Sequence, residues 1–454
     1  GKTMFFKAGR KSALAVVLAL CIMFIAVPVF AQGGNETAAK VDMTKDADGI
    51  AWRQFAGTEL HLGMNKHVYT ETIRFVIDEF EEKTGMKVII EDFAQDEFMN
   101  KRLVDLSSGT GEFDLVMMDS VCTQAAQAGW IENLDEWFKR SDLVNMDKYD
   151  LADIAPSWKI AFTVDDHLYA IPVSGEKQML FYRADIFEEL GLKVPETFDE
   201  LEETAKLLKT KYAGGILLRG QKIHTVSNCT GVIWSYGGRI GDSMDYNYAV
   251  FNSPEAVAGA DMYTRLARLY GPAGIENYTW YECVSDFQQG KVPMYLDMSV
   301  FMSQFEDPTA STVAGKVGYA PMPAGPAGSK PTGGAWAMSM SSSSQHKEAA
   351  FLLLQWLTCP ETSLKLAIEG GISARVSAFQ SEELASKYPA SWLSAFSAAL
   401  AAEVPEVTFP LISRNEEYLD VIGTAFNLMI QKEVDVQALM DETVKKVDIL
   451  FQDK

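Results

Sequence analysis

From residue 59 onward, short apolar runs typical of β-strands alternate with longer segments that have the apolar spacing of helices. Glu59–Met64 and Lys87–Glu91 are predicted strands. Between them, apolar side chains from residue 73 to 80 recur at i, i+3, i+4 and i+7, which predicts a helix ended by Gly85. Asp114–Met118 is a third predicted strand. Its unbroken apolarity indicates burial on both faces of a parallel sheet. This alternation predicts a doubly wound α/β lobe.

A second run of the same kind begins near Leu168. The pattern predicts strands at residues 169–173, 179–182, 215–218 and 336–340, and helices after Thr197 and over 254–270. Thr197 with Glu200 forms a predicted capping box. From Lys347 to the end, the chain is expected to be mainly helical. The sequence therefore predicts a second α/β region after the first.

The charge of the chain excludes one class of partner. It has 62 acidic against 40 basic side chains and a net charge of −22. Nucleic-acid binding needs clustered Lys and Arg side chains, so nucleic acid is not an expected partner.

The first 31 residues have the features of a signal peptide. Four basic side chains precede an apolar run from Ala13 to Val27, and Ala31 suits cleavage before Gln32. A polar spacer, 32–57, would follow. Cleavage would leave a net charge of −26. The alternative is an uncleaved membrane anchor, because the apolar run is nearly long enough to span a bilayer. A lipoprotein signal at Cys21 is disfavoured, since Leu20 stands where a small residue is usual.

Signatures of catalysis and of metal binding are missing. Ser235 lacks the glycine that a nucleophile elbow requires two residues before it, and the five histidines are isolated in sequence. Four cysteines follow the predicted signal without any CxxC spacing: Cys122, Cys229, Cys283 and Cys359. They do not form a disulfide framework, although one disulfide remains open. We expect no catalytic residues, no metal and no cofactor.

Aromatic, glycine, amide and charged residues gather where the predicted strands end. In open α/β sheets, ligands bind beyond the carboxyl ends of the strands. Charged groups bond strongly to hydroxyls, and aromatic faces cover the C–H face of a sugar or polyol. The pattern favours a protein that binds a polyhydroxylated ligand and does not catalyse a reaction on it.

At these residues, the chain resembles the extracellular solute-binding proteins of carbohydrate ABC importers (family 1), the group that includes maltose-binding protein. It is similar in particular to the branch that binds sugars and sugar alcohols such as sorbitol and mannitol. The segments that carry the resemblance are Phe80–Val88, Phe113–Ser120 with Ala128–Trp130, Phe181–Phe187, Pro195–Leu201, Gly333–Met338, and Lys347–Ala350 with Gln355–Thr358. Of these, Phe80, Val88 and Trp356 are expected to be packing residues.

The resemblance implies a two-lobed α/β periplasmic-binding-protein fold of type II. Each lobe would be a doubly wound, mainly parallel sheet flanked by helices. Lobe 1 is expected at 58–170 plus 295–333, and lobe 2 at 171–294 plus 334–454. Hinge crossings would fall near 168–173, 293–297 and 330–336. The cleft residues implied are Asn65, His67, Asp119, Glu176, Arg219, Trp234, Asp297, Trp336 and Arg375.

The function implied is capture of a sugar or sugar alcohol outside the cytoplasmic membrane. A monomeric periplasmic or extracellular protein would deliver it to an ABC permease by hinge closure. The alternatives within binding are an oligosaccharide, a glycerol phosphate or a peptide as ligand. A secreted glycoside hydrolase, which needs two carboxylates across one bond, and a surface-anchored adhesin are the alternatives from other classes.

Overall fold

In the computed structural model of the protein, residues 42–119 and 121–452 are described. The expected signal peptide at residues 1–31 and the first part of the expected spacer lie outside the described residues. Within the described ranges, no helix is both long enough and apolar enough to cross a membrane.

The first sheet has the strand order β2-β1-β3-β11-β6. Strand β1 (Glu59–Asn65) pairs in parallel with β2 (Lys87–Phe93) and with β3 (Leu115–Met118). Strand β11 (Ala337–Met340) runs antiparallel to β3 and to β6 (Ile171–Pro172). All residues of β3 are buried, so the prediction of an apolar strand covered on both faces is confirmed.

The predicted helix over residues 73–80 forms as two shorter helices. Helix α1 (Val68–Ile73) begins earlier than predicted, because the His67 side chain caps it by accepting a hydrogen bond from the backbone N–H of Tyr69. Helix α2 (Ile77–Thr84) follows and ends, as predicted, at Gly85, whose φ of 72° is left-handed.

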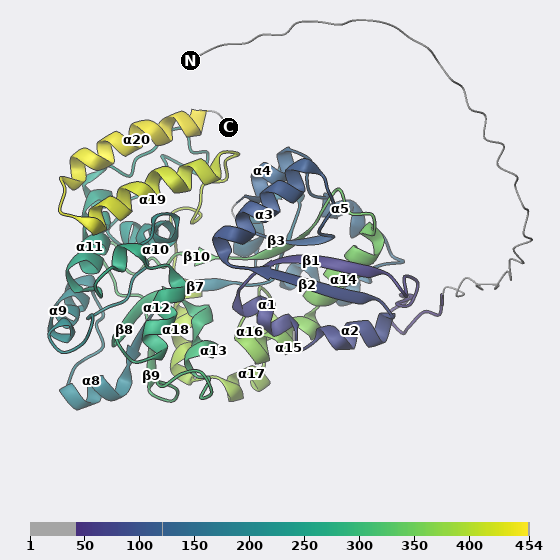
Figure 1. The fold of residues 1–454 in the computed structure, drawn as a ribbon, viewed down its shortest axis with the longest axis horizontal. Helices are drawn as coiled ribbons and strands as arrows, with labels where there is room; N and C mark the ends of the chain where they lie inside the picture. Colours follow the sequence, from purple (N-terminus) through teal and green to yellow (C-terminus); the bar gives the residue numbers. More distant parts are fainter. Residues whose placement is uncertain (1–41, 120, 453–454) are drawn as a thin grey trace, which may run out of the picture. The chain divides into compact units, whose positions relative to one another are not determined.

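Further helices accompany this sheet (Figure 1): α3 (Gln95–Ser108), α4 (Cys122–Gln127), α5 (Leu134–Trp137), α6 (Met146–Tyr149), α7 (Pro156–Lys159), α14 (Lys347–Thr358), α15 (Pro360–Gly370), α16 (Val376–Phe379) and α17 (Glu382–Lys387). The rings of Phe80 and Trp356 pack with centroids 5.3 Å apart, and Val88 is buried, so the assignment of these residues to packing is confirmed. Strands β4 (Thr163–Val164) and β5 (His167–Leu168) form a separate short antiparallel pair that contacts α4 and α5.

The second sheet is built around β7 (Glu176–Arg183). It pairs with β8 (Met294–Met298), β9 (Val317–Pro321) and β10 (Gly333–Gly334). All three pairings are antiparallel, whereas a mainly parallel sheet was expected. The strand predicted at 215–218 is reduced to one parallel bridge between Leu217 and Tyr295.

Strand pairing corrects the expected lobe ranges at two places. Strand β11 lies in the range assigned to lobe 2, yet it pairs with β3 of the first sheet. Strand β8, almost wholly, and strand β9 lie in the range 295–333 assigned to lobe 1, yet both pair with β7 of the second sheet. The chain therefore crosses between the sheets between β6 and β7 and again between β10 and β11. The crossing expected near 293–297 is not formed, because β8, β9 and β10 all pair with β7. A third crossing lies between α17 and α18 (Ala390–Ala401), since α18 packs on β7 and β9.

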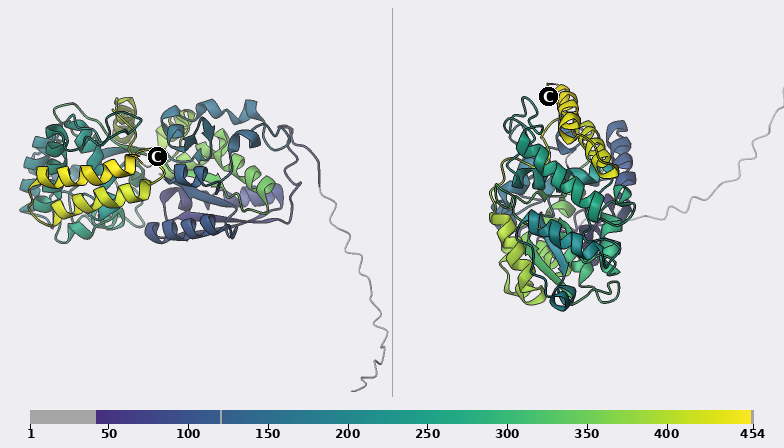
Figure 2. Two further views of the ribbon diagram at one scale, coloured as in Figure 1. Left: turned by 90° about the horizontal axis from the view of Figure 1, so that it is seen from above. Right: turned by 90° about the vertical axis from the view of Figure 1, so that its left-hand side faces the viewer.

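The helices around the second sheet are α8 (Ala184–Leu190), α9 (Phe198–Lys209), α10 (Lys222–Ser235), α11 (Pro254–Tyr270), α12 (Trp280–Gln288), α13 (Met302–Phe305), α18 (Ala390–Ala401), α19 (Asn415–Gln431) and α20 (Val436–Gln452). The capping box of Thr197 and Glu200 is confirmed at the start of α9. Helices α19 and α20 lie side by side and pack against α10 and α11 (Figures 1 and 2). Residues 224–235 of α10 are consequently all buried.

Candidate functional site

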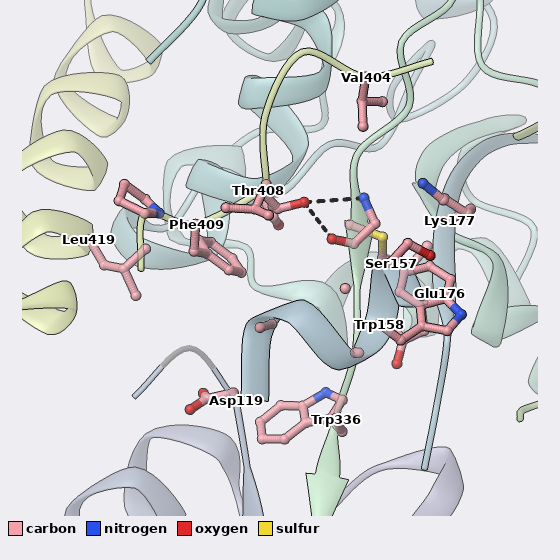
Figure 3. Close-up of a pocket in the computed structure, with 18 of the residues that line it drawn as sticks. Asp119, Ser157, Trp158, Glu176, Lys177, Trp336, Val404, Thr408, Phe409 and Leu419 are labelled. Atoms are coloured by element: carbon pink, nitrogen blue, oxygen red, sulfur yellow. Dashed lines mark hydrogen bonds between the residues drawn. The ribbon is translucent and has the colours of Figure 1, made fainter. Parts of the chain in front are cut away.

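A cavity of about 400 Å³ is lined by residues from elements of both sheets. Six of the nine residues predicted from the sequence line it: His67, Asp119, Glu176, Arg219, Trp234 and Trp336. Asp119 and Trp336 lie at one end, Val404, Thr408 and Phe409 at the other, and Trp158, Glu176 and Lys177 along one side (Figure 3).

His67 and Glu176 form a buried pair on the cavity wall. The Nδ1 atom of His67 accepts the backbone hydrogen bond that caps α1, so Nε2 carries the proton and lies 3.1 Å from Oε1 of Glu176. Oε1 of Glu176 also accepts a hydrogen bond from Ser174. Within the described residues, Oε2 of Glu176 has no hydrogen-bond partner, so it can accept one from a ligand hydroxyl.

Asp119 follows β3 directly and is held by Arg102 of α3. Nη2 of Arg102 lies 2.9 Å from Oδ1 of Asp119, and Nη1 donates to the carbonyl of Met117. The Arg102 side chain is only 2% exposed, which fixes the orientation of the carboxylate. Oδ2 of Asp119 makes no hydrogen bond in the described ranges and remains available to a ligand.

Arg219 lines the cavity, and Asp297 positions it from behind. The guanidinium donates from Nε and Nη2 to the two carboxylate oxygens of Asp297, which is fully buried. Tyr295 and the backbone of Met298 also donate to Asp297. Burial opposes the charge on Arg219, but attraction to Asp297 raises its pKa above the ordinary value. Among the described residues, Nη1 of Arg219 has no partner and can donate to a ligand oxygen.

Two indole side chains supply apolar surface. The Trp336 ring packs beside His67, with centroids 5.8 Å apart. Trp158, which sequence reasoning missed, lies against the backbone at Gly175 and Gly333. A Cβ at Gly175 would stand 2.5 Å from the Trp158 indole, so this close approach requires glycine. Nothing in the sequence around α7 distinguished this Trp from a core residue.

Residues 404–411 form an irregular segment along one end of the cavity, within the C-terminal region that was expected to be mainly helical. Glu406 anchors it by accepting hydrogen bonds from Trp234 Nε1 and from the backbone N–H groups of Ile240 and Gly241. Burial raises the pKa of Glu406. Thr408 Oγ1 bonds to both the N–H and the carbonyl of Gly333 (Figure 3). Because Trp234 donates to Glu406, its indole N–H is unavailable to a ligand.

Comparison with known proteins agrees with this architecture. Residues 67–363 match the family described as bacterial extracellular solute-binding protein. The chain belongs to this family. It is 28% identical to an erythritol/L-threitol-binding protein of Mycolicibacterium smegmatis over 387 residues, covering 80% of each chain.

Two solved structures show the same fold. An ABC transporter solute-binding protein from Agrobacterium radiobacter K84 in complex with ribitol has a TM-score of 0.78 and 28% identity, covering 87% of this chain and 99% of that one. A counterpart from Thermotoga lettingae TMO bound with α-D-tagatose has a TM-score of 0.77 and 26% identity, covering 87% and 100%. This solute-binding protein thus has the two-lobed type II periplasmic-binding-protein fold. The family and these relatives are binding proteins of transporters rather than enzymes.

Three predicted cleft residues of this solute-binding protein lie outside the cavity lining: Asn65, Asp297 and Arg375. Asn65 is fully buried, and its Oδ1 accepts from the Tyr281 hydroxyl. Arg375 donates to the carbonyls of Thr358, Asp150 and Tyr149 and lies 3.3 Å from Asp153. It therefore holds the connections around α6 and α14 instead of facing the cavity.

Side chains near the cavity also join the two halves of the solute-binding protein directly. Nε2 of His224 on α10 lies 3.3 Å from Oδ1 of Asp96 on α3, a contact that lowers the pKa of Asp96. Trp280 Nε1 on α12 donates to Gln95 Oε1 over 2.9 Å. These contacts pair residues far apart in sequence, so no local pattern could predict them.

The described residues contain no group of three or more His, Cys, Asp or Glu side chains arranged to hold a metal ion. The cysteines of this range, which are Cys122, Cys229, Cys283 and Cys359, are free.

Proposed function

We propose that this solute-binding protein captures a sugar or sugar alcohol outside the cytoplasmic membrane and delivers it to the permease of an ABC importer. The relatives named for erythritol and L-threitol, and the neighbours in complex with ribitol and tagatose, support this ligand class.

The observation that carries the proposal is the composition of the cavity. Asp119 and Glu176 each offer a carboxylate oxygen without a partner among the described residues, and Arg219 offers a free N–H group. Trp158 and Trp336 add apolar faces beside them. Hydroxyl groups alternate with C–H groups along a polyol or sugar, so such a ligand would match both kinds of surface. The volume of about 400 Å³ is within the usual range for a small-molecule site.

Closure over the ligand would convert binding into a signal for the permease. Asp119 and His67 belong to elements of the first sheet, whereas Glu176 and Arg219 belong to elements of the second. A ligand that touches both sets stabilises the closed arrangement relative to an open one. The three chain crossings would absorb the hinge rotation.

The signal peptide would direct export and be cleaved after Ala31, which leaves a chain with a net charge of −26. The exported protein would be a monomer. Mass spectrometry of the exported protein would identify its first residue, and light scattering its mass. A retained N-terminus would contradict cleavage and favour an anchor.

A thermal-shift and calorimetry screen tests the ligand class. The panel would contain erythritol, L-threitol, ribitol, mannitol, tagatose and maltose, with glycerol phosphate and a peptide mixture as other solutes. We expect at least one polyol or sugar to raise the melting temperature in a concentration-dependent way. A response only to glycerol phosphate or peptide would contradict the proposal. Release of reducing sugar from a polysaccharide panel would support a glycoside hydrolase in its place.

A further inference from the structure

Lys177 is a buried cation without a counter-charge. Its residue exposure is 7%, and it is the one lysine among the described residues that is buried to this degree. No carboxylate oxygen within the described part of the chain lies within 4.0 Å of Nζ, and no hydrogen bond to Nζ is formed there. Only the backbone N–H of Lys177 has a partner, the hydroxyl of Ser299.

The buried arginines differ from Lys177 in this respect. Arg102 is paired with Asp119, and Arg375 with Asp153 and three carbonyls. Burial of an amine away from hydrogen-bond acceptors is unfavourable. The ordinary structural explanation, an internal ion pair, therefore does not apply to Lys177.

The surroundings of Lys177 connect it to the cavity. Its side chain lines the cavity on the same side as Glu176 and Trp158 (Figure 3). Nζ lies 5.4 Å from the centroid of the Trp158 ring, which is itself held against the backbone at Gly175 and Gly333. A ligand in the cavity can thus supply hydrogen-bond acceptors to Nζ, for which the described residues provide none.

We propose that Lys177 is a specificity-determining residue whose ammonium group donates hydrogen bonds to an oxygen at the end of the ligand that lies against Trp158. This inference rests on the proposed function, because it names one contact of the same site. The oxygen is a hydroxyl of an alditol or a carboxylate of the corresponding aldonate. Both are acceptors, and a terminal C–H or methyl group would leave the amine unpaired.

Calorimetry of wild type, Lys177→Met and Lys177→Gln with the best-binding polyol or sugar of the panel tests the contact. We expect both variants to bind at least about tenfold more weakly. The melting temperature of the free Lys177→Met protein should be unchanged or higher, because the substitution removes a buried unpaired charge. If Lys177 only stabilised the fold, Lys177→Met would have a lower melting temperature than wild type. Lys206→Met is the control, since Lys206 is exposed on α9 and lies outside this cavity, and it should bind within about twofold of wild type.

The outcomes separate the two proposals. Affinities of Lys177→Met and Lys177→Gln within about twofold of wild type would overturn the inference alone. Failure of wild type to bind any polyol or sugar would overturn the proposed function and this inference with it. Parallel titrations with ribitol and ribonate identify the preferred acceptor: an equal loss for both assigns a hydroxyl, and a larger loss for ribonate than for ribitol assigns the carboxylate.

Discussion

Nε2 of His67 lies 3.1 Å from Oε1 of Glu176, and this contact joins the start of α1 to the start of β7. The two residues belong to elements of different sheets, and both side chains are less than 10% exposed. This contact therefore connects elements of the two sheets at the wall of the cavity, where Oε1 of Glu176 also accepts a hydrogen bond from Ser174.

Replacement of Glu176 by Gln should weaken ligand binding about tenfold or more. The amide keeps the shape of the side chain, but it places an NH2 group where a carboxylate oxygen accepts a hydrogen bond. Calorimetric titration of the variant measures the loss. Glu132→Gln is a suitable control, because Glu132 is a carboxylate outside the cavity. Equal affinities for Glu176→Gln and wild type would show that Glu176 does not contact the ligand.

Replacement of Asp297 by Asn should weaken binding even though Asp297 does not line the cavity. Arg219 would lose its counter-charge and its fixed orientation, and the uncompensated buried cation should cost about 3 kcal/mol of stability. Urea unfolding and titration measure the two effects. Asp286→Asn, at another buried aspartate outside the cavity, should lower stability without changing affinity. Unaltered affinity in Asp297→Asn would mean that Arg219 has no role in binding.

Replacement of Arg375 by Met should lower stability by about 3 kcal/mol or more and leave affinity within about twofold of wild type. Three backbone carbonyls and the carboxylate of Asp153 would lose their donor. Chemical unfolding gives the first value and calorimetry of the folded protein the second. A loss of ligand affinity without a loss of stability would indicate that Arg375 belongs to the binding site.

Lys177 should make stability depend on pH in alkaline solution. Burial lowers the pKa of its amine from 10.5 to about 8, so between these values the unfolded chain binds more protons than the folded one. Wild type should therefore gain up to about 3 kcal/mol relative to Lys177→Met as the pH rises through this window. Melting temperatures of both proteins at several pH values measure the difference. Parallel pH profiles would contradict it.

Replacement of Thr408 by Val should loosen the segment 404–411. The side chain keeps its shape but loses both hydrogen bonds to Gly333, at a cost of about 1–2 kcal/mol. Weaker ligand binding should accompany this loss, because the segment lines the cavity. Thr204→Val, on the exposed surface of α9, is the control and should change neither property. A Thr408→Val protein with wild-type stability and affinity would exclude an anchoring role for these bonds.

Local patterns located several of the residues that line the cavity. His67, Asp119 and Glu176 were found because each stands next to a predicted strand, and the ends of strands gather at one edge of a sheet. Arg375 lies outside the lining, because the residues next to it in sequence do not reveal that the carbonyls of Tyr149, Asp150 and Thr358 surround its side chain. Trp158 and the segment 404–411 were missed, since their position at the cavity depends on contacts with Gly333 and Trp234 from distant parts of the chain.

The sequence by itself determined the α/β character of the chain, the first three strands, the helix caps at Gly85 and Thr197, and the resemblance to solute-binding proteins. These features depend on apolar periodicity and short-range capping, which neighbouring residues decide. Only the tertiary structure decided that β8 belongs with β7, that β11 returns to the first sheet, and that Lys177 is buried without a counter-charge. These strands pair with partners more than a hundred positions away in sequence, and the burial of Lys177 depends on how they pack, so a local sequence pattern shows neither feature.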